Sequence, residues 1–293
     1  MPLTRTIENY WRLTKPRIWG LLVFTGIIAM LVSYKETVGA VISPSLILVC
    51  FVALTLGSAS ADVLTNYHDR DIDKMMKRTM NRPIPSGEIL PRNALVYGLT
   101  MASLSVLIPL LLINEASATF MLIGLLDNVV VYSLLLKRRS WLNIILGGFS
   151  GGMPVLVGYA AVPGSNPLSP IALYMSALVM VWIPTHIWSL AIFSRADYEA
   201  AKVPMLPVVF GDRVASVCVA GTSALLGVFS LALVFLRPSV IYAASAVFLG
   251  AIVLAYSAKL AVDRKRETAW TLFKITSPYL TLIFIALGVA VWT

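Results

Sequence analysis

Long apolar segments alternate with short polar ones along almost the whole of this 293-residue chain. Each apolar segment has about the 20 residues that a helix needs to cross a bilayer. The segments lie at approximately 18–34, 42–66, 93–113, 117–136, 142–162, 170–194, 214–236, 239–261 and 270–292. No interval between them is long enough for a separate soluble domain. The pattern predicts an all-α polytopic membrane protein, a bundle of nine transmembrane helices that forms a single domain over residues 1–293.

The composition agrees with a chain buried in lipid. It is 58% hydrophobic and 13% charged, whereas soluble domains carry about 25% charged residues. Cys50 and Cys218 both fall in apolar stretches, so neither a disulfide framework nor a zinc site is expected. No apolar run precedes Ile18, so we expect no cleaved signal peptide and no transit peptide.

Basic residues gather on one side of the predicted membrane. Of the 23 Lys and Arg residues, all but Lys35 and Arg237 fall at the N-terminus, in alternate loops or in the ends of the spans beside those loops. The positive-inside rule makes that side cytoplasmic. An odd number of spans then places the N-terminus inside and the C-terminus outside a multi-pass protein of the cell membrane. The net charge of +9 is therefore attributed to topology, and nucleic acid is not expected as a partner.

The densest polar stretch is "NYHDRDIDKMMKRTMNRPIPSG", where the second span meets the cytoplasm. The spacing of Asp62, Asn66, Asp69 and Asp73 places them within an arc of roughly 60° on one helix face, with Asp71 opposite. Carboxylate and amide oxygens are ligands for a hard cation, and Mg²⁺ is commonly held by a few carboxylates plus phosphate oxygens. The stripe predicts a magnesium site.

Two arginines follow the stripe and extend this interpretation. Arg78 and Arg82 carry the fork-shaped cations that suit phosphate, so the segment favours a diphosphate with an apolar tail. The alternative is a solvated, charge-balanced loop that supplies the positive-inside signal. That alternative explains the arginines but not Asp62, because an ionisable group inside an apolar run is costly.

The same segment carries a resemblance. "NYHDRDID" followed by "RPIPSG" resembles the first aspartate-rich motif of the intramembrane prenyltransferases of the UbiA superfamily, which has acidic or amide residues at Asn66, Asp69 and Asp73. Three further segments, "LTKPR" (13–17), "KRRSWLNIILGGFSGGMPVLVGYAA" (137–161) and "WIPTHIWSLAIFSRADYEAAKVPMLPVV" (182–209), resemble the branch that farnesylates haem.

The resemblance implies a lipid-accessible cavity whose polar end lies at the cytoplasmic face. Farnesyl diphosphate would bind there, with Mg²⁺ bridging its phosphates to Asn66, Asp69 and Asp73. The leaving diphosphate would be held by Arg78, Arg82, Lys137 and Arg138. A vinyl group of haem b would attack the allylic carbon, and water would complete haem O. The apolar walls would protect the cation from premature water.

A second motif differs from the family pattern. Many members have two or more aspartates there, whereas this chain offers Asp197 and Glu199. Tyr198 is assigned to substrate binding, and Lys202 to a phosphate counter-charge that replaces part of a metal's role. Whether a second Mg²⁺ binds is left open.

Other polar residues lie inside predicted spans. His186 is either a ligand of the haem iron, since His is a usual axial ligand, or an interhelical hydrogen-bonding residue. Asp127 is expected to face the bundle interior or to be protonated, with a structural hydrogen bond as its default role. The glycines of "GGFSGG" (147–152) are expected to allow close helix packing.

Two other functions compete with haem farnesylation. One is a UbiA-type prenyltransferase that acts on a quinone precursor or a glycerol-phosphate lipid. The other is a non-enzymatic haem-binding or transport protein. The polar cluster lies at the membrane edge, whereas transporters place their sites near the midplane, so the pattern favours the enzyme. Membrane lipid and haem-handling membrane proteins are the expected partners.

Overall fold

A computed structural model describes residues 3–292 of the chain, which form helices joined by short loops. In these residues, nine helical stretches are long and apolar enough to cross a membrane, and no strand is present. The all-α, nine-helix prediction is therefore confirmed.

The elements are α1 (Leu3–Leu13), α2 (Pro16–Glu36), α3 (Pro44–His68), α4 (Arg70–Met75), α5 (Pro91–Leu112), α6 (Glu115–Leu126), the π-helix η1 (Asp127–Leu136), α7 (Asn143–Leu146), α8 (Phe149–Ala160), α9 (Pro170–Phe193), α10 (Arg195–Ala200), α11 (Leu206–Leu236), α12 (Val240–Asp263) and α13 (Arg266–Trp292).

Several long helices begin at a Ser-Pro pair. Ser43 and Ser169 each accept a hydrogen bond from a backbone N–H in the first turn of the helix that follows, α3 and α9 respectively. Proline occupies the next position in both helices, where its missing N–H costs nothing. The chain therefore marks where these helices begin independently of the apolar pattern.

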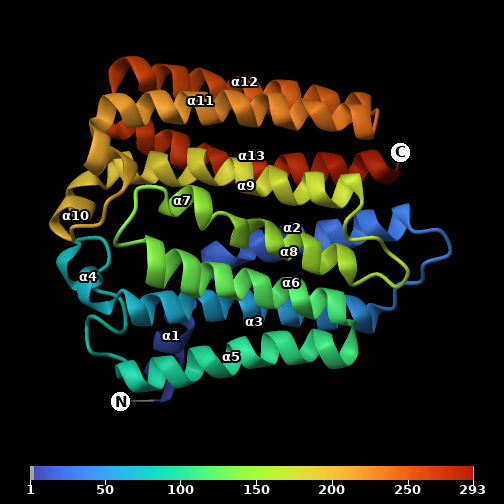
Figure 1. Ribbon diagram of the computed structural model, residues 1–293, viewed down its shortest axis with the longest axis horizontal. Helices are drawn as coiled ribbons and strands as arrows, with labels where there is room; N and C mark the ends of the chain where they lie inside the picture. Colours follow the sequence, from blue (N-terminus) through green and yellow to red (C-terminus); the bar gives the residue numbers. More distant parts are fainter. Residues whose placement is uncertain (1–2, 293) are drawn as a thin grey trace.

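The long helices run side by side in successive layers (Figure 1). α11 and α12 form one outer layer, α9 and α13 the next, α2 and α8 the centre, and α3, α6 and α5 the other side. Every residue from Gly151 to Ala160 in α8 is buried, so α8 lies at the centre of the bundle.

Small residues let α8 approach its neighbours closely. A Cβ added to Gly158 would lie 1.9 Å from the backbone oxygen of Gly26 in α2. A Cβ on Gly151 would lie 2.3 Å from a side-chain carbon of Ile183 in α9. The packing role predicted for the glycine-rich segment therefore holds.

Three spans contain irregular backbone. The fifth is divided at Gly147 and Gly148, between α7 and α8. The fourth continues from α6 into the ten-residue π-helix η1. The helix α11 begins at Leu206, earlier than the predicted start near 214, but Gly211 interrupts it with φ 78° and ψ 167°. A left-handed glycine at this point reconciles the two boundaries.

The short helices α4, α7 and α10 gather at one end of the bundle (Figure 1). The loops that carry both acidic motifs therefore meet at this end. The opposite end holds the loops around 37–43 and 161–169.

Candidate functional site

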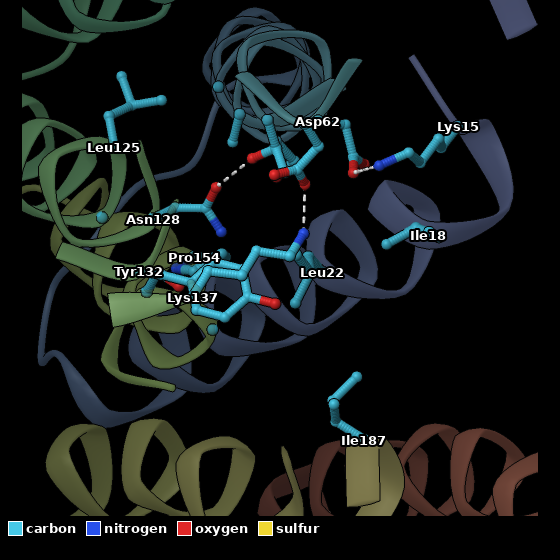
Figure 2. A pocket seen from close by; sticks show the side chains of 18 of the residues that line it. Lys15, Ile18, Leu22, Asp62, Leu125, Asn128, Tyr132, Lys137, Pro154 and Ile187 are labelled. Carbon is cyan, nitrogen blue, oxygen red and sulfur yellow. Dashed lines mark hydrogen bonds and ion pairs between the residues drawn. The ribbon is translucent and has the colours of Figure 1, made fainter. Parts of the chain in front are cut away.

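A cavity of about 290 Å³ opens inside the bundle beside α3. One wall is polar and includes the carboxylates of Asp62, Asp69 and Asp73. The other walls are largely apolar and include Leu54 of α3 and Ile187 of α9. Figure 2 shows Ile187 across the cavity from the polar side chains. A charged wall facing apolar ones suits a ligand with an anionic head and a hydrocarbon tail.

The predicted carboxylate stripe crosses a break in the helix. α3 ends at His68, and Asp69 has φ −85° and ψ 2° before α4 begins. The backbone N–H of Asp73 still donates to the carbonyl of Asp69 at 2.8 Å, so the helical spacing continues. Asp71 faces outward, with its side chain 61% exposed. Asp62, Asp69 and Asp73 therefore share one face, as the spacing predicts.

Each carboxylate of the stripe forms an ion pair with a cation from another segment. Asp62 pairs with Lys15 at 3.0 Å, and Asp73 pairs with Arg82 at 2.8 Å. Asp69 pairs with Lys137, which follows η1. These pairs keep buried charges compensated. They also hold three cations at the cavity wall, where an anionic ligand would meet them.

The donor set fits Mg²⁺ only together with a phosphate ligand. Within residues 3–292, no three His, Cys, Asp or Glu side chains gather closely enough to hold a metal by themselves. Asp69 is fully buried, and its Oδ1 has no hydrogen-bond partner among the described residues. An orphaned buried carboxylate oxygen is costly, and coordination would satisfy it. Mg²⁺ is usually bound by one or two carboxylates plus substrate phosphates, which matches Asp69 and Asp73.

Asn66 lies behind this wall rather than on it. Its side-chain N–H donates to the carbonyl of Leu13 at 3.0 Å, and its oxygen accepts from Arg82 at 3.1 Å. Because the amide oxygen already binds Arg82, metal binding by Asn66 would require Arg82 to turn away. Its assignment as a metal ligand stays a prediction.

Asp197 of the second motif binds the loop after the first motif. Its carboxylate accepts hydrogen bonds from the backbone N–H groups of Lys77 and Arg78 at 3.2 and 3.3 Å. Arg78 itself lines the cavity, and so does the buried side chain of Tyr198. Lys202 is exposed and is not part of the lining. The second motif therefore positions the loop of Arg78 and adds one aromatic wall residue.

Lys137 and Arg138, which follow η1, have different surroundings. Lys137 lines the cavity, whereas Arg138 forms a two-point ion pair with Asp71 at 2.6 and 2.7 Å. The hydrogen bonds from Arg138 lower the pKa of Asp71 to about 2. Arg138 also donates to the carbonyl of His68, so it fastens the α3–α4 junction rather than the cavity wall.

His186 faces the interface between α9 and α13. Its ring lies between Trp182 and Phe273, with both ring centroids at 4.3 Å. Its Nδ1 is 2.7 Å from the hydroxyl of Thr276, and His186 is not part of the cavity lining. This geometry favours the interhelical hydrogen bond over the haem-iron ligand.

Several polar residues of the cavity wall are not assigned to the site from the sequence, among them Lys15, Asn128 and Tyr132. Figure 2 shows all three directed into the cavity. The signal for Lys15 was its place in "LTKPR", and that for Asn128 was an amide inside an apolar span. Neighbouring Asp127 accepts from the backbone N–H of Ser150 at 2.8 Å, which agrees with the structural hydrogen bond expected for it.

Comparison with known proteins places these features in a family. The UbiA prenyltransferase family matches residues 22–288. The protoheme IX farnesyltransferase of Thermoplasma volcanium is 42% identical over 280 residues, which cover 95% of this chain and 96% of that protein.

Solved structures share the fold at lower identity. A digeranylgeranylglyceryl phosphate synthase superposes with a TM-score of 0.77 at 19% identity, over 98% of both chains. A UbiA homologue from Archaeoglobus fulgidus bound to GPP and Mg²⁺ has a TM-score of 0.69 at 19% identity, over 97% of this chain and 99% of that one. At this identity the likeness concerns the fold alone.

Proposed function

This chain belongs to the UbiA prenyltransferase family, and from that premise we propose that it is a protoheme IX farnesyltransferase. It would transfer the farnesyl group of farnesyl diphosphate to a vinyl group of haem b and form haem O. The observation that carries the proposal is the cavity, in which paired carboxylates and cations face apolar walls. The 42% identity to a protoheme IX farnesyltransferase over nearly the whole chain supports the choice of acceptor.

The polar wall would bind and activate the diphosphate. Asp69 and Asp73 offer carboxylate oxygens for Mg²⁺, and Arg78, Arg82 and Lys137 offer N–H donors for phosphate oxygens. A bound Mg²⁺ supplies Lewis-acid stabilisation of the charge that develops on the diphosphate. The cationic side chains add to this stabilisation because they are fixed in place before the reaction.

The bond changes follow from this arrangement. The allylic C–O bond breaks and leaves its electron pair on the diphosphate. The vinyl π-electrons then form the new C–C bond, and water adds to the resulting cation with loss of a proton. Leu54, Ile187 and Leu190 line the cavity and would keep water from the farnesyl cation before the vinyl group attacks.

We also propose that the end of the bundle that holds α4, α7 and α10 faces the cytoplasm of a cell-membrane protein, with the whole chain acting as one domain. Single cysteines at Ser165 and Ser140, in a chain whose Cys50 and Cys218 are replaced by Ser, would test the orientation. A membrane-impermeant thiol reagent added outside should label position 165 and not position 140. The reverse labelling would overturn the orientation.

The activity itself is tested with membranes that contain the chain. Incubation with haem b and farnesyl diphosphate should give haem O, identified by mass spectrometry. Parallel reactions with quinone precursors and glycerol-phosphate lipids would detect the competing prenyltransferases. Haem that is bound but unchanged would indicate the non-enzymatic alternative.

A further inference from the structure

Lys15 has an unusual position at the cavity wall. It directly precedes α2 with φ 53° and ψ 62°, in the left-handed region that non-glycine residues rarely adopt. Pro16 follows it, and a residue before proline normally favours extended backbone. Strained backbone of this kind is unfavourable and is concentrated at functional sites. The fold therefore holds Lys15 in place at a cost.

The side chain of Lys15 reaches Asp62 and retains donors for a ligand. Its ammonium is 3.0 Å from the carboxylate of Asp62, and both side chains are more than four-fifths buried. Among the residues that the structure describes, Asp62 is its one hydrogen-bond partner. An ammonium carries three N–H donors, so Lys15 retains donors for a ligand in the cavity that it lines.

This pair is separate from the carboxylates assigned to the diphosphate. Asp62 lies on α3, seven residues before Asp69 at the α3–α4 junction, which corresponds to about 10 Å along a continuous helix. Ile18 lies near Lys15 at the cavity wall, and Leu22, one turn further along α2, also lines the cavity (Figure 2). An ammonium in the same cavity, paired with a carboxylate other than Asp69 and Asp73 and bordered by apolar side chains, suits an anionic group on an otherwise apolar acceptor.

We propose that Lys15 binds a carboxylate of the acceptor, an inference that rests on the proposed function. Haem b is a rigid macrocycle that carries its carboxylates and its vinyl groups at different edges. A carboxylate held by Lys15 would fix the macrocycle while its vinyl edge meets the farnesyl carbon beside the diphosphate. Asp62 holds the ammonium in place before the acceptor arrives.

Haem whose carboxylates are esterified tests whether Lys15 binds a carboxylate of the acceptor, because the ester lacks the charge that Lys15 would bind. KM is measured for haem b and for its dimethyl ester, at saturating farnesyl diphosphate, in wild type and in Lys15→Met. In wild type, esterification should raise KM about 10- to 100-fold, as expected for losing a hydrogen bond between charged groups. Lys15→Met should raise KM for haem b similarly, leave KM for the ester unchanged and leave KM for farnesyl diphosphate unchanged. Lys259→Met, an exposed lysine on α12, is the matched control and should change none of these values.

A second variant controls for the possibility that Lys15→Met destabilises the fold. Lys15→Met leaves the carboxylate of Asp62 buried and unpaired, whereas Lys15→Met/Asp62→Leu removes both charges, a change that buried ion pairs often tolerate. The double variant should likewise fail to distinguish haem b from its ester, and Lys15→Arg should restore much of the distinction.

Three results would overturn the inference. One is equal loss for haem b and its ester in Lys15→Met, which indicates a structural role. Another is a raised KM for farnesyl diphosphate alone, which assigns Lys15 to the donor phosphate. The third is a wild type that does not distinguish the two acceptors. Absence of any haem farnesylation by wild type would instead refute the proposed function.

Discussion

α3 and α9 both carry polar side chains within the bundle, and they use these side chains in opposite ways. The acidic residues of α3 and its continuation, Asp62, Asp69 and Asp73, face the cavity and pair with cations from other segments. On α9, Thr185 bonds to Thr222 of α11, and His186 bonds to Thr276 of α13. The cavity receives apolar side chains from α9, such as Ile187 and Leu190.

The partner of a polar side chain indicates whether that side chain serves binding or helix packing. A hydroxyl or imidazole that bonds to the adjacent helix is satisfied by the fold and contributes to holding helices together. A carboxylate paired with a lysine at a cavity wall can exchange that partner for a ligand. In a membrane protein, the direction of a polar side chain is therefore more informative than its presence.

The largest expected effect on activity follows from substitutions of the carboxylates that line the cavity at the end of α3. Asp69→Asn and Asp73→Asn should each lower kcat by about two orders of magnitude or more, because they remove charge that would hold Mg²⁺ and the diphosphate. Asp71→Asn, on the outward side of the same stretch, is the matched control and should stay close to wild type. Turnover should also stop in excess chelator and return with added Mg²⁺.

Normal activity of Asp69→Asn or Asp73→Asn would remove that carboxylate from the mechanism. It would also contradict the proposal that polar residues of α3 serve binding whereas those of α9 serve helix packing. Full turnover in excess chelator would separately exclude the metal.

A smaller and different effect is expected on α9. His186→Ala removes a ring stacked between Trp182 and Phe273 and a hydrogen bond to Thr276. We expect a loss of about 1–3 kcal/mol in stability, seen as a lower Tm in detergent. Changes in KM should be similar for haem b and farnesyl diphosphate. A shifted haem absorption spectrum with unchanged Tm would instead support the iron-ligand alternative.

The smallest effect concerns the exposed pair of Arg138 and Asp71. The pKa of Asp71 is about 2 beside Arg138, below the ordinary value for an aspartate. The pair therefore stabilises the fold above pH 4, and this contribution is lost as pH falls toward 2. Arg138→Ala should lower stability at pH 7 by less than about 1 kcal/mol, because the pair is largely solvated.

Thermal unfolding in detergent at several pH values measures this contribution. The difference between wild type and Arg138→Ala should shrink between pH 4 and pH 2. A difference that stays constant over that range would show that Arg138 acts through its bond to the carbonyl of His68 instead.

Most of the fold follows from the sequence because lipid leaves few alternatives. A backbone in hydrocarbon must satisfy its own hydrogen bonds, so apolar segments of sufficient length are helices. The irregular points are less visible. The break at Gly147 and Gly148, the π-helix η1 and the left-handed Gly211 depend on neighbouring helices, and hydropathy does not report such contacts.

The residues of the candidate site likewise fall into those that local sequence spacing predicts and those that depend on contacts between distant segments. Helical spacing alone placed Asp62, Asp69 and Asp73 on one face, because these residues are close in sequence. The pair of Lys15 with Asp62 joins residues 47 positions apart, and no local pattern predicts it. The direction of His186 depends on where α13 packs against α9. The assigned residues that line the cavity are Asp69, Asp73, Arg78, Arg82, Lys137 and Tyr198, and those that do not are Asn66, Arg138, His186, Asp197 and Lys202.

The π-helix η1 has a consequence for how this chain tolerates insertions and deletions. Its wider turns end where the backbone N–H of Lys137 donates to the carbonyl of Tyr132, five residues earlier, at 2.8 Å. Removing one residue from 127–136 would change the rotation of everything that follows about the helix axis and would move Lys137 away from Asp69. The fourth span should therefore accept changes of side chain on its lipid face but not changes of length. Inserting or deleting one residue in 127–136 should therefore disrupt the pairing of Lys137 with Asp69.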